Sequence, residues 1–147
     1  MKFSISRYNP DKDEKPYLQD YAMDILPSDR MLLDVLLRIK EQDPTLSMRK
    51  SCREGVCGSD AMNINGTNGL ACITRVRDLT EPVVLHPLPG FPIIRDLIVD
   101  MTQFFKQYHS IKPWLMNDGL LPERERLRSP AGRERQDGLY EFRLCAR

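Results

Sequence analysis

The chain opens with short segments in which hydrophobic and polar positions follow a regular pattern. Residues 2–8 alternate as a strand does, and residues 17–23 can return as the second arm of a hairpin. Residues 31–42 carry apolar side chains at helical spacing, and Ser28 or Asp29 before them is a residue type that caps helices. The pattern therefore predicts a β-hairpin followed by one helix.

Beyond this helix, the pattern predicts a loop and three more short strands. Residues 47–59 are mostly small, polar or cysteine and show no period, which is typical of a loop. Short apolar runs follow at residues 61–64, 70–73 and 83–85, the second of them after a tight turn predicted at Asn68-Gly69. This order of elements is that of a β-grasp sheet with one helix across its face, so we expect an α+β fold.

The character of the chain changes after residue 94. Apolar residues beyond it suit a helix that Lys112-Pro113-Trp114 closes. Residues 117–137 are rich in Arg, Glu, Pro and Gly, which predicts a linker around a short charged helix. We therefore divide the chain into a β-grasp domain with a C-terminal helix, residues 1–115, and a linker with the start of a further segment, residues 116–147.

Composition and charge exclude several classes of protein. The chain has 147 residues, of which 41% are hydrophobic and 29% charged, as in a globular protein. A net charge of +1 gives no electrostatic case for nucleic acid as a partner. The sequence contains no apolar run of the roughly 18 residues that a membrane-spanning helix needs, and residues 1–5 lack the apolar core of a signal peptide. We therefore expect a reducing cytosolic compartment, where cysteines serve as metal ligands more often than as disulfides.

The cysteines are distributed unevenly along the chain. Cys52, Cys57 and Cys72 lie close together, while Cys145 stands alone near the end. With Asp60, the first three form the pattern C-x4-C-x2-D-x11-C. This spacing matches the plant-type [2Fe–2S] pattern C-x4-C-x2-C…C, with an aspartate in the third place. The sequence therefore predicts a [2Fe–2S] cluster that passes single electrons between partners.

The residue types in this segment suit the chemistry of such a cluster. Four anionic ligands must converge from a short loop, and Gly55 and Gly58 permit the unusual backbone torsions that this wrapping needs. Asp60 supplies the same single negative charge as a thiolate, although a carboxylate is a harder ligand. Ser59 is a poorer candidate because its hydroxyl would have to ionise. We therefore expect Asp60 to be the fourth ligand, beside the three clustered cysteines.

Two other interpretations of the cysteines fit less well. A structural zinc site would normally show C-x2–4-C pairs with four Cys or His ligands, whereas the nearest histidine is His86 and the glycine-rich C-x4-C loop is atypical for zinc. An extracellular disulfide would need an export signal, which the N-terminal residues do not show.

The cysteine loop is part of a longer set of motifs. Residues 51–60, with Asn65-Gly66 and Leu70-Ala71-Cys72, resemble the iron–sulfur subunit of succinate dehydrogenase, the succinate:quinone oxidoreductase of the respiratory chain. So do the runs His-Pro-Leu-Pro-Gly at 86–90 and Arg-Asp-Leu-Ile-Val-Asp at 95–100. The resemblance covers almost the whole chain. Some bacterial members of this family carry aspartate where this chain has it, whereas the related fumarate reductase subunit usually has a fourth cysteine.

This resemblance implies an electron relay. A flavoprotein subunit oxidises succinate on FAD, and electrons enter the iron–sulfur subunit through its [2Fe–2S] cluster, with Cys52, Cys57, Asp60 and Cys72 as ligands. They continue through [4Fe–4S] and [3Fe–4S] clusters in a C-terminal helical domain and reach quinone at membrane-anchor subunits. The family serves the tricarboxylic acid cycle and aerobic respiration.

The same resemblance implies partners and a location. This chain would contact the FAD-containing flavoprotein and would meet the anchor subunits only indirectly. It would be peripheral, on the cytoplasmic side of the bacterial inner membrane, or cytoplasmic if unassembled. No acid–base or nucleophile constellation is apparent in the sequence, so we expect an enzyme only as a subunit of the complex, without a substrate active site of its own.

The chain departs from the family pattern at its end. After Leu-Tyr-Glu the family has a C-x2-C-x2-C run, of which this chain has Phe142 in first place and Cys145 in second before it stops at Arg147. A single thiol cannot hold a cluster that needs four cysteine ligands. We therefore expect a C-terminally truncated member in which the helical ferredoxin domain is essentially absent and neither the [4Fe–4S] nor the [3Fe–4S] cluster is supported. The alternatives are a fumarate reductase iron–sulfur subunit and a free-standing ferredoxin-like carrier or interaction module.

Overall fold

The computed structural model of the chain describes residues 1–114, 116 and 129–134. The chain divides into two compact units, Met1–Asp100 and Met101–Arg147, and each is described here by itself. In the part of the chain that the structure describes, none of the helices has the length and apolar character needed to cross a membrane.

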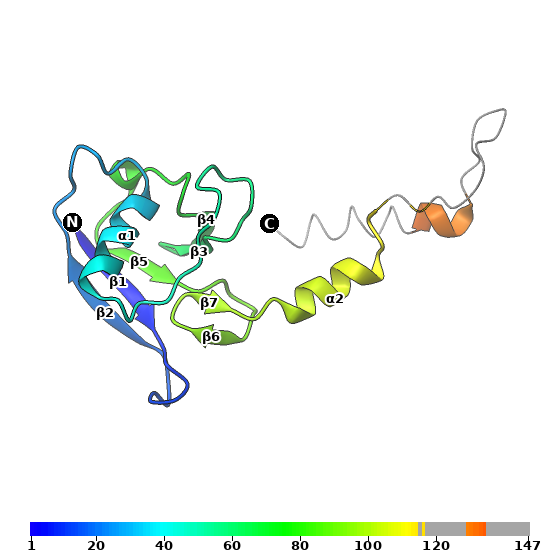
Figure 1. The fold of residues 1–147 in the computed structure, drawn as a ribbon, viewed down its shortest axis with the longest axis horizontal. Helices are drawn as coiled ribbons and strands as arrows, with labels where there is room; N and C mark the ends of the chain where they lie inside the picture. Colours follow the sequence, from blue (N-terminus) through cyan, green and yellow to red (C-terminus); the bar gives the residue numbers. More distant parts are fainter. Residues whose placement is uncertain (115, 117–128, 135–147) are drawn as a thin grey trace. The chain divides into compact units, whose positions relative to one another are not determined.

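The first unit is built on a five-stranded mixed sheet (Figure 1). Its strands lie in the order β2-β1-β5-β3-β4, in which β1 and β5 are parallel and every other neighbouring pair is antiparallel. The strands are β1 (Lys2–Arg7), β2 (Tyr17–Ala22), β3 (Ala61–Ile64), β4 (Thr67–Leu70) and β5 (Val83–His86). The predicted α+β fold of the β-grasp type is confirmed.

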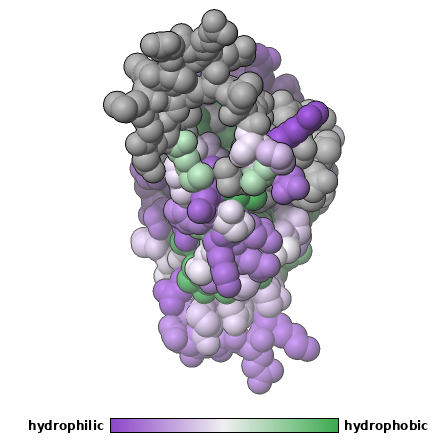
Figure 2. Space-filling model, turned by 90° about the vertical axis from the view of Figure 1, so that its right-hand side faces the viewer, coloured by the Kyte–Doolittle hydropathy of each residue, from purple (hydrophilic) through white to green (hydrophobic). Residues whose placement is uncertain are grey.

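One helix, α1 (Leu32–Gln42), lies across a face of this sheet (Figure 1). Its apolar residues Val35, Leu36 and Ile39 recur at helical spacing and are fully buried, as are Phe3 and Ile5 on β1. The sheet and the helix thereby enclose one hydrophobic core. On the face seen in Figure 2, the described residues are mainly hydrophilic, and apolar side chains appear only in small areas between them.

The start of α1 differs from the prediction. Neither Ser28 nor Asp29 is the N-cap, because the residue before the helix is Met31. The carboxylate of Asp34 accepts the Met31 backbone N–H at 2.9 Å and so satisfies one donor at this end. The buried Asp29 instead forms an ion pair with the partly exposed Arg38, whose Nη1 lies 2.6 Å from Asp29 Oδ2. The cap prediction was wrong because tertiary contacts engage Asp29 elsewhere.

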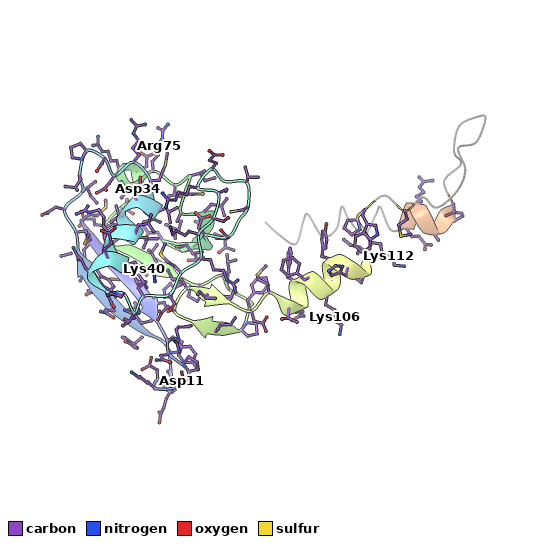
Figure 3. All side chains as sticks on the ribbon, in the orientation of Figure 1. Asp11, Asp34, Lys40, Arg75, Lys106 and Lys112 are labelled. Atoms are coloured by element: carbon purple, nitrogen blue, oxygen red, sulfur yellow. The ribbon has the colours of Figure 1, made fainter. Side chains whose placement is uncertain are left out.

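Two further donors at the start of α1 bind the segment that follows β4. The Leu32 N–H donates to the Thr74 carbonyl at 2.8 Å, and the Leu33 N–H donates to the Ala71 carbonyl at 3.0 Å. Figure 3 shows Arg75, from the same segment, near the end of α1 that carries Asp34. The helix N-terminus therefore holds the turn between residues 71 and 74 in place.

The strand predicted at residues 70–73 begins and ends earlier than expected. Asn65 and Gly66 both have positive φ, 48° and 86°, and form the two-residue turn of the β3–β4 hairpin. This is the conformation that the favoured hairpin turns need. Asn68-Gly69 then lies inside β4 instead of forming a second turn, and Cys72 lies in the turn after β4.

The helix predicted after residue 94 also begins later than expected. Residues Ile93–Arg95 (β6) and Ile98–Val99 (β7) pair as a small antiparallel hairpin, with Asp96 at a φ of 47° in the turn. The helix α2 spans Thr102–Ser110 and has no buried residue. Apolar residues between 93 and 99 fit a strand as well as a helix, which is why spacing alone misassigned them.

The predicted linker and the last residues lie mostly outside the described residues. Within it, residues 130–134 are helical, in agreement with the short helix expected there. The assignment of domains to residues 1–115 and 116–147 stays a prediction.

Candidate metal centre

The loop between α1 and β3 brings two of the predicted ligands together. The Cys57 N–H donates to Cys52 Sγ at 3.3 Å, and the Cys52 N–H donates to Cys57 Sγ at 3.5 Å. The Glu54 N–H also points at Cys52 Sγ, at 3.4 Å. Both cysteines are at least partly accessible to solvent. Backbone N–H groups aimed at thiolate sulfur are the kind of hydrogen bond that tunes an iron–sulfur cluster.

The backbone of this loop turns through left-handed conformations. Arg53, Gly55 and Gly58 have φ values of 65°, 75° and 67°. Gly55 is doubly restricted, because a Cβ there would lie 2.9 Å from Ile73 Cγ2. The two glycines were identified from the sequence, whereas the positive φ at Arg53 carries no sequence signal, since arginine is an unusual residue in this region.

The other two predicted ligands meet at the open end of the β3–β4 hairpin. The hairpin pairs Ala61 with Leu70, so Asp60 just before β3 faces the segment just after β4. The Ala71 N–H donates to the Asp60 carbonyl at 3.3 Å, and the Cys72 N–H donates to Asp60 Oδ2. Asp60 and Cys72 are both buried, with 3% and 4% of their surface exposed.

The thiols differ in how their surroundings affect ionisation. The pKa of Cys57 is lowered to about 6, mainly by the hydroxyl of Ser59, whose Oγ lies 3.1 Å from Cys57 Sγ, with backbone N–H groups adding to the effect. The pKa of Cys72 is raised by burial and then by its hydrogen bond to Asp60, while the Gly55 N–H acts in the opposite direction. Thiolates are the ligand form, so a bound metal would have to displace the proton from Cys72.

The Gly55 N–H is the link between the two pairs of ligands. It lies in the Cys52–Cys57 loop and lowers the pKa of the Cys72 thiol. The negative charge of Cys52 acts on the same thiol and raises its pKa. Among the described residues, no three His, Cys, Asp or Glu side chains converge on a single ion position. A [2Fe–2S] cluster does not need such convergence, because its four ligands are shared between two irons. Three thiols and one carboxylate around a loop of inward N–H groups fit this cofactor.

One residue outside the predicted ligand set also contacts the loop. The carboxylate of Asp96 in the β6–β7 turn accepts the Ser47 N–H at 2.7 Å, and Ser47 is the residue at which the predicted loop begins. Sequence reasoning missed Asp96 as a contributor to the site. The run Arg-Asp-Leu-Ile-Val-Asp was noted for its resemblance only, and nothing in it indicates a contact 49 residues away in sequence.

Comparison with known proteins identifies the family. A family model described as "2Fe-2S iron-sulfur cluster binding domain" matches residues 2–106. The chain belongs to this family. Its predicted [2Fe–2S] cofactor is therefore confirmed, and with it the electron-transport character of the domain.

The resemblance to succinate dehydrogenase iron–sulfur subunits is confirmed as well. The chain is 56% identical over 147 residues to the "Succinate dehydrogenase iron-sulfur subunit" of Coxiella burnetii, covering 99% of this chain and 63% of that protein. It is 49% identical to the "Succinate dehydrogenase [ubiquinone] iron-sulfur subunit 1, mitochondrial" of Oryza sativa, covering 98% of this chain and 53% of the relative. The chain thus spans between half and two-thirds of the length of these relatives.

A solved structure shares the fold. It is described as "Mycobacterium smegmatis Sdh1 complex in the apo form", and one of its chains matches with a TM-score of 0.71 and 29% identity. The match covers 86% of this chain and 53% of that one. The sequence and the fold therefore point to the same group of oxidoreductase subunits.

Proposed function

We propose that this chain transfers single electrons through a [2Fe–2S] cluster held by Cys52, Cys57, Asp60 and Cys72, as part of the iron–sulfur subunit of a succinate dehydrogenase. The observation that carries the proposal is the buried carboxylate of Asp60 beside Cys72. Among the described residues, no ion pair compensates its charge.

Burial without a cation partner is costly for a carboxylate. Buried charges are normally paired or bound to metal. The Cys72 N–H engages one oxygen of Asp60, and a ligating carboxylate is typically oriented by such a hydrogen bond. Iron beside Asp60 would supply the missing positive charge, while the N–H contact would fix the direction in which the carboxylate points.

The side chains and N–H groups of this chain would hold the cluster and tune it. The cluster, when bound, supplies a one-electron redox couple. The N–H groups of Cys52, Glu54 and Cys57 stabilise negative charge on the ligand sulfurs. The buried Asp60–Cys72 side is shielded from water, whereas the Cys52–Cys57 side reaches the surface, where a redox partner can approach.

The proposed partners and location rest on the resemblance to succinate dehydrogenase iron–sulfur subunits. A flavoprotein carrying FAD would oxidise succinate and pass electrons to this cluster, from which they would proceed toward quinone at membrane-anchor subunits. The chain would then serve the tricarboxylic acid cycle from a peripheral position on the cytoplasmic side of the membrane. The names of both relatives support the assignment to a succinate dehydrogenase.

Two measurements test the proposal in turn. Iron and sulfide are quantified after anaerobic reconstitution of the full chain, and the dithionite-reduced protein is examined by EPR. About two irons per chain and a rhombic S = 1/2 signal are expected, whereas zinc or a colourless protein would refute the cluster. Affinity purification from the native host then tests the partner: recovery of a flavoprotein supports the subunit role, and a monomeric redox-active protein supports a free-standing carrier.

A further inference from the structure

A buried ion pair between Arg7 and Asp96 lies next to Ser47, where the loop of residues 47–59 begins. Arg7, at the end of β1, has only 8% of its side chain exposed. Its Nε lies 3.0 Å from Asp96 Oδ1, and its Nη1 lies 2.7 Å from Asp43 Oδ2. Its remaining bonds go to Gln19, Tyr21 and Thr45. The guanidinium is therefore held on several sides and provides a fixed anchor.

Asp96 uses this anchor to connect three segments of the chain. Its Oδ1 accepts the Tyr8 N–H at 2.9 Å in addition to Arg7, and its Oδ2 accepts the Ser47 N–H at 2.7 Å. The backbone adds to the connection, because the Leu97 N–H donates to the Ser47 carbonyl at 3.3 Å. With 3% of its side chain exposed, this carboxylate has little freedom to move.

We propose that Asp96 is a positioning residue for the cluster: held by Arg7, it fixes Ser47 and thereby the point from which the loop reaches Cys52. The inference rests on the proposed function, because it concerns the same cluster. Hydrogen bonds to an ionised acceptor are shorter and about twice as strong as neutral ones. Partners that orient metal ligands typically change metal affinity by about 10–100-fold when removed.

Asp43 provides a matched comparison within the same network. It also pairs with Arg7, and its other side-chain bonds go to Tyr21 and Thr45. In the described part of the chain, its side chain makes no bond to residues 47–59. Asp43→Asn and Asp96→Asn thus remove the same charge from the same arginine, but only Asp96→Asn alters a side chain that bonds directly to the loop.

Asparagine at position 96 keeps the shape of the side chain and loses part of its bonding. The carboxylate accepts three N–H donors over its two oxygens. An amide has one acceptor oxygen, so its NH₂ group must face at least one of these donors. The bond to Ser47 and the bonds to Arg7 and Tyr8 cannot all persist.

The test compares wild type, Asp96→Asn and Asp43→Asn as full-length reconstituted chains. Cluster loss to an iron chelator is followed by absorbance, with EPR g values and the midpoint potential recorded for each. We expect Asp96→Asn to lose its cluster about tenfold faster or more and to shift the EPR signal, whereas Asp43→Asn stays within about twofold of wild type. Equal behaviour of the two variants would mean that Asp96 only stabilises the fold and would overturn the proposal.

A second readout needs no cluster. Hydrogen exchange in the apo protein should increase over residues 47–57 in Asp96→Asn and not in Asp43→Asn, and unchanged exchange there would also overturn the proposal. If Asp96→Asn does not fold, Ser47→Pro removes the donor and leaves the Arg7–Asp96 pair, and the same acceleration of cluster loss is expected. A wild-type chain without a two-iron signal would instead refute the proposed function, so the two failures are distinguishable.

Discussion

The backbone N–H of Cys72 donates a hydrogen bond to the carboxylate of Asp60, twelve residues earlier in the chain. The β3–β4 hairpin creates this contact, because its register brings the residues just outside its two ends together. A buried carboxylate is thereby aimed at the turn that carries a buried thiol. This contact holds two of the four proposed ligands, Asp60 and Cys72, next to each other.

Asp60→Ala is expected to abolish stable cluster binding. The substitution removes one of the four anionic ligands and leaves the three thiols in place. Iron content after anaerobic reconstitution should fall well below the wild-type value, and the EPR signal of the reduced protein should be lost or altered. Asp60→Cys should restore iron binding with a shifted absorbance spectrum, because a fourth thiolate replaces a harder ligand.

Ser59→Ala is the control for this prediction. Ser59 is adjacent in sequence and contacts Cys57, but we do not assign it as a ligand. Its removal should leave the iron content unchanged. An unchanged spectrum in Asp60→Ala, together with a lost spectrum in Ser59→Ala, would show that the fourth ligand is the serine.

The helix and the first strands could be predicted from the sequence because their signals are local. Val35, Leu36 and Ile39 face one side at helical spacing and are buried as expected. The helix cap could not be predicted, because Asp29 was drawn into an ion pair with Arg38. The cysteine spacing likewise identified the cofactor, since a cluster constrains nearby positions in the sequence.

Other features depend on contacts that are distant in sequence. Two Asn-Gly pairs compete for the turn before Cys72, and only the pairing of β3 with β4 selects the first of them. Asp96 is an ordinary turn residue in the sequence, and its partner Arg7 lies 89 residues away. Such contacts leave no periodic pattern in the sequence. The bond between Asp96 and the start of the loop could therefore be found only in the folded chain.

Gly55→Ala is expected to weaken cluster binding through two effects. The φ of 75° is unfavourable for alanine, and the new Cβ would lie 2.9 Å from Ile73 Cγ2. Gly66→Ala is the matched control, because Gly66 has a φ of 86° but no atom within 4 Å of the added Cβ. Chelator-driven cluster loss should be faster in Gly55→Ala than in Gly66→Ala.

A double variant separates the two effects at Gly55. Gly55→Ala combined with Ile73→Ala removes the steric conflict and retains the backbone strain. Partial recovery of cluster lifetime would indicate that both effects contribute. Equal lifetimes for Gly55→Ala and Gly66→Ala would contradict the prediction, since only Gly55 packs against a neighbour.

Leu36→Ala should destabilise the first unit substantially. Leu36 on α1 is fully buried between the helix and the sheet, and truncating a buried leucine costs about 2–5 kcal/mol. Leu18→Ala on β2 is the control, because Leu18 is 51% exposed and surface substitutions usually stay within about 0.5 kcal/mol. Urea unfolding of the apo protein, followed by circular dichroism, measures both. A similar loss of unfolding free energy in the two variants would contradict the assigned core.

The stability of the apo protein should fall as the pH drops below about 4, the ordinary range of an aspartate, and Asp43 should contribute to this loss. Its pKa in the folded chain lies well below the usual value, mainly because the Thr45 hydroxyl donates to it, with Tyr21 and Arg7 adding to the effect. Because the unfolded chain takes up the proton first, its population rises on acidification. The contribution of Asp43 is therefore fully present above this range and is lost as the pH falls further.

Asp43→Asn removes this proton-linked contribution while keeping the shape of the side chain. The free energy of unfolding, measured with urea between pH 2.5 and 7, should then decline less steeply on the acid side than in wild type. Asp20, whose pKa is lowered chiefly by the Ser4 hydroxyl, is present in both proteins and adds the same slope to each. Identical slopes for wild type and Asp43→Asn would mean that the hydrogen bonds from Thr45, Tyr21 and Arg7 do not lower the pKa of Asp43. A shallower slope would show that these hydrogen bonds keep Asp43 ionised in the folded chain below the ordinary range of an aspartate.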